Sequence, residues 1–257
     1  MIKFLSIIAQ SSVFLSLIVT IAPAKAASIT IANSGFENPD LTGVEPVIGD
    51  EVFTFETPPQ WQLYDPSGLI PAETNLETSY PGVWNPSADF YPEDVPEGEN
   101  IGAIFLNQTP GSGVVGFSQT LSNTLEANTQ YTLQVGVGNP GASLFAGFPG
   151  YAVQLLAGDT VIAEDNNTLE IAEGSFATST VVYSTSVNEP NLGEPLQLRL
   201  LNTLEDNGLE VNFDNVELST TSITESTPVP ESNSITSLLL LGIGLLTIKF
   251  RNLLITE

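Results

Sequence analysis

Two carboxylates near the ends of the central region form the pattern with the clearest chemistry. Glu37 lies in Asn33-Ser34-Gly35-Phe36-Glu37-Asn38-Pro39, and Asp214 lies in Val211-Asn212-Phe213-Asp214-Asn215-Val216-Glu217-Leu218. In the second segment Val211 and Phe213 alternate with Asn212 and Asp214, so we expect a strand with its apolar side chains in the core and its polar ones facing out. Calcium takes carboxylate and carbonyl oxygens, so anionic ligands from opposite chain ends can close a β fold around one ion. We therefore predict a Ca²⁺ site at Glu37 and Asp214; the alternative is that both are solvated residues.

Composition excludes several other kinds of site. The 257 residues include no histidine and no cysteine, which rules out a Ser-His-Asp triad, a cysteine nucleophile and a His/Cys zinc site. Leaving out Glu231 and Glu257, residues 27–230 hold 28 of the 30 acidic residues and a single basic one, Arg199, so this part of the chain carries a formal charge near −27. Such a surface repels nucleic acid. The charge also keeps an exported protein soluble, which is the simpler reading for most of these carboxylates.

Large aromatic residues suggest a second kind of site. The stretch 40–99 is rich in Pro, Gly and acidic residues yet holds many aromatic rings, so we expect long ordered loops packed over one face or end of the domain. The residues that we expect to line a ligand pocket are Trp61, Tyr64, Trp84, Phe105 and Phe148. The alternative is that these rings close a thin core beneath the loops.

The elements that position these residues are short strands. Segments rich in Val, Ile, Thr, Tyr and Phe are separated by turn clusters of Gly, Pro, Asn and Asp, and no segment of the central region has a helical period. The expected strands are 28–33, 101–106, 131–137, 151–156, 178–183, 196–200 and 209–218. This spacing predicts an all-β domain over residues 27–220, a two-sheet β-sandwich of the jelly-roll type.

The N-terminus is typical of a secretory signal peptide. Lys3 precedes an apolar run, and Ala24-Lys25-Ala26 offers small residues before a cleavage point, so residues 1–26 are expected to be removed and the mature chain to begin at Ala27.

The C-terminal end has the order of a sorting signal. A Ser/Thr/Pro-rich linker, 221–234, contains Val229-Pro230-Glu231-Ser232, and the tail 235–257 holds a short apolar run, expected to be helical, and basic residues. As a helix this run spans about 21 Å, less than the bilayer core of about 30 Å. The arrangement resembles the PEP-CTERM signal of Gram-negative bacteria, with Ser232 in place of a proline. The resemblance implies processing by an exosortase and transfer to the cell surface or matrix; the alternative is a plain membrane anchor.

The central region resembles two groups of proteins. The segments around Glu37 and Asp214 are similar to the ends of carbohydrate-binding-module-like jelly rolls, in which such residues hold a structural calcium. From Ser28 to Ser219 the chain also resembles exported bacterial proteins, mostly PEP-CTERM-tagged, that include the calcium-dependent Stig cyclases of cyanobacterial hapalindole-type alkaloid biosynthesis. The stretches that carry this second resemblance include 83–86, 96–102, 117–121, 131–133, 148–151, 155–158, 176–181 and 192–196.

The two resemblances imply different roles for Asp214. In the Stig cyclases an acidic side chain in the last strand is thought to start a Cope rearrangement and cyclisation of a prenylated indole, and Asp214 stands at the matching position. A carboxylic acid donates a proton at neutral pH only where apolar surroundings raise its pKa, whereas a bound cation favours the ionised form. Phe105 stands where the cyclases have a tyrosine, and the loop 138–148 is shorter than theirs.

Three functions follow from these observations. The first is an exported surface or matrix module, stabilised by calcium, that binds a saccharide or a small apolar ligand, with extracellular polysaccharide as a partner. The alternatives are a Stig-like cyclase and a purely structural exported domain. The sorting tail favours the first hypothesis.

Overall fold

The computed structural model describes residues 26–141, 145 and 147–223. Within them the chain forms strands and loops only, in the order β1 (Ala27–Ile29), β2 (Val52–Phe53), β3 (Gln62–Tyr64), β4 (Tyr80–Asn85), β5 (Ile101–Phe105), β6 (Val115–Thr124), β7 (Thr129–Asn139), β8 (Tyr151–Ala157), β9 (Thr160–Asn166), β10 (Ser175–Ser184), β11 (Pro195–Asn202) and β12 (Glu210–Ser222). The predicted all-β fold is confirmed.

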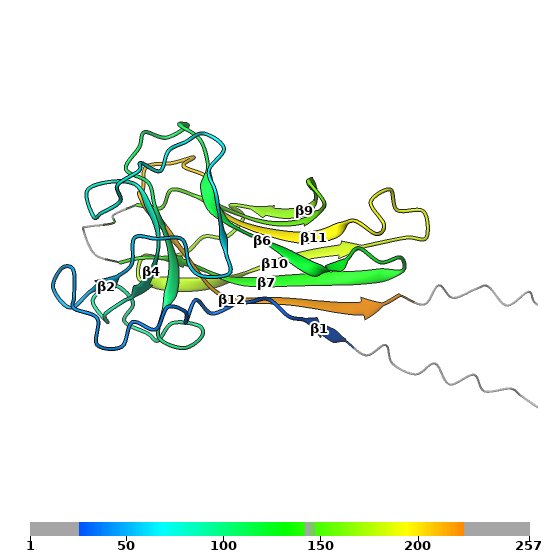
Figure 1. Ribbon diagram of the computed structural model, residues 1–257, viewed down its shortest axis with the longest axis horizontal. Coiled ribbons are helices and arrows are strands. Elements are labelled where there is room, and N and C mark those ends of the chain that lie inside the picture. Colours follow the sequence, from blue (N-terminus) through cyan, green and yellow to red (C-terminus); the bar gives the residue numbers. More distant parts are fainter. Residues whose placement is uncertain (1–25, 142–144, 146, 224–257) are drawn as a thin grey trace, which may run out of the picture. The chain divides into compact units, whose positions relative to one another are not determined.

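The strands form two antiparallel sheets that lie face to face (Figure 1). The seven-stranded sheet has the order β10-β7-β12-β5-β4-β2, and the five-stranded sheet has the order β3-β6-β11-β8-β9. Strand β12 is central, because β7 pairs along one edge while β5 and then β1 pair along the other. The last strand therefore passes beside both the first strand and the segment that precedes β5.

The sandwich core lies between the sheets. Alternate residues of the facing strands point inward, as the period of two in a β-strand requires. Phe117, Leu133, Val153, Leu200 and Phe213 are all buried there without measurable exposure. The expected inward direction of Val211 and Phe213 is thus confirmed.

A second cluster covers the other face of the seven-stranded sheet. It consists of Phe53, Tyr80, Trp84, Phe90, Tyr91, Ile101, Ala103, Phe105 and Phe145, and we call it the aromatic cluster. Loops from the stretch 40–99 lie over the end of the molecule that holds β2 and β4 (Figure 1). This stretch was expected to form loops only, but it also supplies β2, β3 and β4.

These three strands were not predicted because the stretch is rich in Pro and Gly, and both residues disfavour β-sheets. Pro81 is tolerated inside β4 because β2 pairs only with Trp84 and Asn85, so that among the described strands none pairs with this edge of β4 at Pro81.

The predicted signal peptide, most of the linker and the apolar tail lie outside the described residues. Among the residues that are described, no helix is long and apolar enough to cross a membrane.

Candidate active site

A buried carboxyl group lies inside the aromatic cluster. Tyr80, Phe105 and Glu210 are neighbours across β4, β5 and β12 in direct register. The Glu210 side chain is completely buried. The Tyr80 hydroxyl donates to Glu210 Oε2 at 3.2 Å, and Asn212 Nδ2 donates to Oε1 at 2.9 Å. Both carboxyl oxygens therefore have a partner, and neither partner is a cation.

This environment keeps Glu210 substantially protonated near neutral pH. Burial raises its pKa from 4.5 to about 7, although the hydrogen bonds from Asn212 and Tyr80 partly oppose the rise. The pKa of Tyr80 is well above its ordinary value because of burial and the nearby Glu210 charge, so its hydroxyl remains a donor. A glutamic acid with such a pKa is suited to general acid catalysis.

Aromatic rings surround this acid. The ring of Phe105 stacks on Tyr80 at 5.1 Å between centroids and meets Phe145 edge-on at 5.9 Å. Phe145 also contacts Trp84 at 5.6 Å, and Trp84 stacks on Phe53 at 4.9 Å. Ring faces of this kind pack against flat aromatic ligands and stabilise positive charge.

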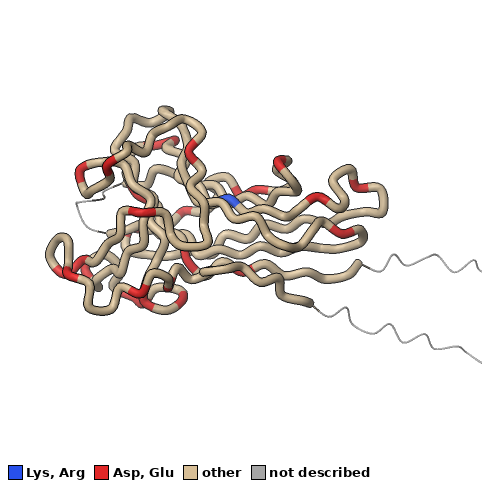
Figure 2. Tube along the Cα trace, in the orientation of Figure 1, with Lys and Arg blue, Asp and Glu red and all other residues tan. Residues whose placement is uncertain are grey.

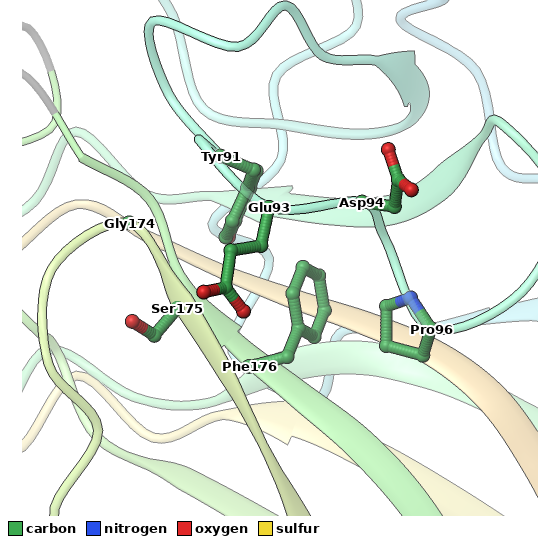
Figure 3. A pocket seen from close by; sticks show the side chains of 7 residues that line it. All are labelled: Tyr91, Glu93, Asp94, Pro96, Gly174, Ser175 and Phe176. Atoms are coloured by element: carbon green, nitrogen blue, oxygen red, sulfur yellow. The ribbon is translucent and has the colours of Figure 1, made fainter.

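Tyr91 lines a surface pocket and is linked to Glu210 by hydrogen bonds through Asn212. The pocket has a volume of about 290 Å³, and Tyr91 and Phe176 form its apolar wall while Glu93 and Asp94 lie on the adjoining loop (Figure 3). The hydroxyl of Tyr91 donates to Asn212 Oδ1 at 2.7 Å, and the amide of Asn212 in turn holds Glu210. Tyr91 thus holds the Asn212 amide, which in turn orients the Glu210 carboxyl group.

Asp214 lies further along the same strand, in a different environment. Its Oδ2 accepts from the backbone N–H of Glu97 at 2.8 Å, and Oδ1 accepts from the N–H of Asn215 at 2.7 Å. The pKa of Asp214 is raised to about 8, chiefly by burial and to a smaller extent by the charges of Glu97 and Glu37, while these two hydrogen bonds partly oppose the rise. Glu37 accepts from the N–H groups of Glu99 and Asn100, both at 2.8 Å.

The fold therefore brings Glu37 and Asp214 to one corner, where Glu97 joins them; we call these three residues the acidic corner. Carboxylates without a basic neighbour suit a hard cation chemically. Within the described ranges, however, no group of three or more His, Cys, Asp or Glu side chains is placed to hold a metal ion. The three carboxylates of the acidic corner therefore do not point toward one common position in this structure.

The five aromatic residues expected to line one pocket lie in three places. Trp84 and Phe105 belong to the aromatic cluster. Trp61 lies in the sandwich core, where it stacks on Phe36 at 5.4 Å, and Phe148 packs against the same core. Tyr64 lies on the outer face of the five-stranded sheet, beneath Arg199.

Glu210 was not among the predicted site residues, although the alternating pattern of β12 contains a signal for it. Glu210, Asn212 and Asp214 alternate with Val211 and Phe213, so they share the face opposite the core. We expected that face to be polar and exposed, but Glu210, Asn212 and Asp214 are all buried. Distant segments, the loops around Tyr80 and Tyr91, cover it.

Comparison with known proteins identifies relatives of this architecture. The family model described as HpiC1 cyclase matches residues 27–219. A Stig cyclase from Fischerella sp. TAU, solved in complex with (3Z)-3-(1-methyl-2-pyrrolidinylidene)-3H-indole, shares 43% identity at a TM-score of 0.72; the match covers 78% of this chain and 100% of that one. A cyclase from the same source, solved with 4-(1H-indol-3-yl)butan-2-one, also shares 43% identity, at a TM-score of 0.70, and the match covers 77% of this chain and 100% of that one.

Other comparisons add less. The CBM22-1 xylan-binding domain from Paenibacillus barcinonensis reaches only 13% identity and a TM-score of 0.42, over 80% of this chain and 100% of that domain, a level that says nothing about ligand binding. None of the curated proteins compared with the chain matches it. The family model and the 43% identity over complete cyclase chains establish that this chain belongs to the HpiC1-like cyclase family.

Proposed function

We propose that the protein is a cyclase acting on a prenylated indole and that Glu210, rather than Asp214, is its acid. The observation that carries the choice of Glu210 is its place beside Tyr80 and Phe105 in the aromatic cluster, because the pKa values of both carboxyl groups are raised, to about 7 for Glu210 and to about 8 for Asp214. The substrate class is supported by the indole ligands of the Fischerella cyclases. These findings favour the cyclase hypothesis over the saccharide-binding surface module that we preferred from sequence.

The proposed chemistry is an isomerisation with no net gain or loss of atoms. Glu210 gives its carboxyl proton to the substrate, which becomes cationic while a carboxylate forms. The Tyr80 hydroxyl and the Asn212 amide already donate to the two oxygens, so they stabilise the new anion without rearrangement. The faces of Trp84 and Phe105 stabilise the cation during ring closure. Loss of a proton from the product cation restores the acid.

Calcium is proposed for the acidic corner, not for the reaction centre. The ligands would be Glu37, Glu97 and Asp214, whose chemistry fits a hard cation. Its contribution would be structural: it would favour the ionised form of the buried Asp214, whose pKa is otherwise raised to about 8, and tie the start of the chain, the loop before β5 and the last strand together. Along β12, Asp214 is four residues from Glu210, about 13 Å at the rise of an extended strand, so the ion would not displace the acidic proton of Glu210.

Export is part of the proposal on sequence grounds. The signal peptide, the exosortase-type processing and the surface or matrix destination rest on the two chain ends, which lie outside the described residues.

Turnover by matched variants tests the assignment. Wild-type protein, Glu210→Gln and Asp214→Asn are incubated with prenylated indoles in saturating calcium, and products are separated by chromatography after circular dichroism has confirmed folding. We expect cyclised product from the wild type, a loss of about 10²-fold or more in Glu210→Gln, and retained turnover in folded Asp214→Asn. Full activity of Glu210→Gln with loss in Asp214→Asn would assign the acid to Asp214. If the wild type converts no substrate in the series, the cyclase proposal is wrong.

A further inference from the structure

The outer face of the five-stranded sheet carries an ordered polar row. The strand register pairs Gln62 with Ser118, Ser118 with Arg199, Arg199 with Gln154, and Gln154 with Glu164. These side chains point away from the sandwich core, because their neighbours Phe117, Leu200 and Val153 point into it. One residue from each of the five strands thus contributes to a continuous line of hydrogen-bonding groups.

A shallow hollow lies beside this row. Two residues further along each strand, the register brings together Tyr64, Gly116, Leu201, Ala152 and Asn166. Ala152 has only a methyl side chain, which leaves space above the sheet. The resulting pocket has a volume of about 350 Å³ and is lined by residues of both rows together with Thr203, Glu205 and Val161.

The hollow holds the one basic residue of the described part of the chain. Arg199 is the only Lys or Arg there, as Figure 2 shows. Its guanidinium lies 4.4 Å from the centre of the half-buried Tyr64 ring. An aromatic ring beneath a guanidinium restricts the orientation of the guanidinium. The N–H groups lie in the guanidinium plane and point outward from it, where a ligand can accept hydrogen bonds from them.

Several buried polar atoms around the hollow have no hydrogen-bond partner among the residues that the structure describes. They are Arg199 Nε, Gln154 Oε1 and Thr203 Oγ1. An unpaired buried donor or acceptor is costly, so native structures supply a partner from solvent or a ligand. Here donor and acceptor atoms lie at one pocket, and the missing partner must both donate and accept.

We propose that this hollow binds a neutral saccharide. Sugar hydroxyls donate and accept hydrogen bonds, which matches the mixture of Arg199, Gln154 and Thr203, while the apolar face of a sugar ring packs on Tyr64 and Leu201. An anionic ligand is disfavoured because Glu164 and Glu205 line the same pocket and the domain is strongly acidic. The site lies on the sheet opposite Glu210, so it is a second function, independent of the proposed cyclisation.

Calorimetry with defined sugars tests the proposal. The probes are cellohexaose, xylohexaose and mannohexaose as neutral chains, and the hexamer of galacturonate as a charged one. We expect at least one neutral hexasaccharide to bind the wild-type protein. We expect Tyr64→Ala to weaken binding about tenfold, Arg199→Met, which keeps the apolar stem, to weaken it about tenfold or more, and Gln154→Ala about fivefold. Gln134→Ala, an exposed glutamine on the other sheet, is the matched control and should change nothing.

The outcomes are decisive in each direction. Loss of binding in the three variants and not in Gln134→Ala supports the site, whatever the result of the turnover assay. The proposal is overturned if no neutral hexasaccharide binds, if only the galacturonate hexamer binds, or if the three variants bind as tightly as the wild type.

Discussion

Replacing Glu210 by glutamine should change how the stability of the protein depends on pH. The ordinary pKa of 4.5 describes Glu210 in the unfolded chain, whereas burial raises the pKa to about 7 in the folded protein. Below pH 4.5 Glu210 is protonated in both the folded and the unfolded state, so its titration does not lower the free energy of unfolding. As the pH rises from 4.5 to 7, the unfolded chain releases the proton while the folded protein retains it, so the free energy of unfolding falls.

The expected loss is about 3 kcal/mol once the pH exceeds 7, from the difference between the two pKa values. Glutamine has nearly the same shape and cannot ionise, so Glu210→Gln should lack this loss. Relative to the wild type, the variant should therefore gain about 3 kcal/mol in free energy of unfolding between pH 4 and pH 8. Other titrating groups, including Asp214, are present in both proteins and cancel in the comparison.

Urea unfolding followed by tryptophan fluorescence measures this difference, at one fixed calcium concentration and at several pH values. Glu173→Gln, which removes an exposed carboxylate, is the control and should follow the wild type. Parallel pH profiles for the wild type and Glu210→Gln would refute the reasoning, because they would mean that Glu210 titrates normally in the folded protein.

Three further predictions follow from the same structure. Tyr80→Phe removes a hydrogen bond that lowers the pKa of Glu210, so the carboxyl signal of Glu210 in a ¹³C NMR titration should move to a higher pH; an unchanged midpoint would show that this bond does not act on the acid. Calcium at a hundred times its dissociation constant should raise the free energy of unfolding of the wild type by about 2.7 kcal/mol. Asp214→Asn should lose most of that gain, and magnesium should substitute poorly for calcium. An equal calcium response in both proteins would show that Asp214 is not a calcium ligand. N-terminal sequencing of exported protein should begin at Ala27, and retention of residues 1–26 would contradict the signal peptide.

The local sequence pattern was sufficient to predict many of the strands. The expected strands at 101–106, 131–137, 151–156, 178–183 and 196–200 coincide with β5, β7, β8, β10 and β11 or lie within them, because alternation and turn residues are local signals. Strand β4 was missed because Pro81 and Gly82 oppose a strand locally, and pairing with β5 compensates for them.

The candidate site shows where local pattern is insufficient. Alternation on β12 predicted correctly that Asn212 and Asp214 share the face opposite Val211 and Phe213, but not that Glu210 joins them or what covers that face. Burial of Glu210 depends on Tyr80, 130 residues earlier in the chain, and that of Asn212 on Tyr91, 121 residues earlier. Asp214 and Glu210 are both acidic residues of one strand, and only the tertiary contacts distinguish the acidic corner from the aromatic cluster.

The pH dependence of turnover tests the central claim most directly. If Glu210 must be protonated to act, kcat/KM for a prenylated indole should be constant below about pH 7 and should fall about tenfold for each further pH unit, with a midpoint that moves upward in Tyr80→Phe. A rate that stays constant from pH 5 to pH 9, or a midpoint that moves in Asp214→Asn and not in Tyr80→Phe, would contradict the assignment of Glu210 as the acid.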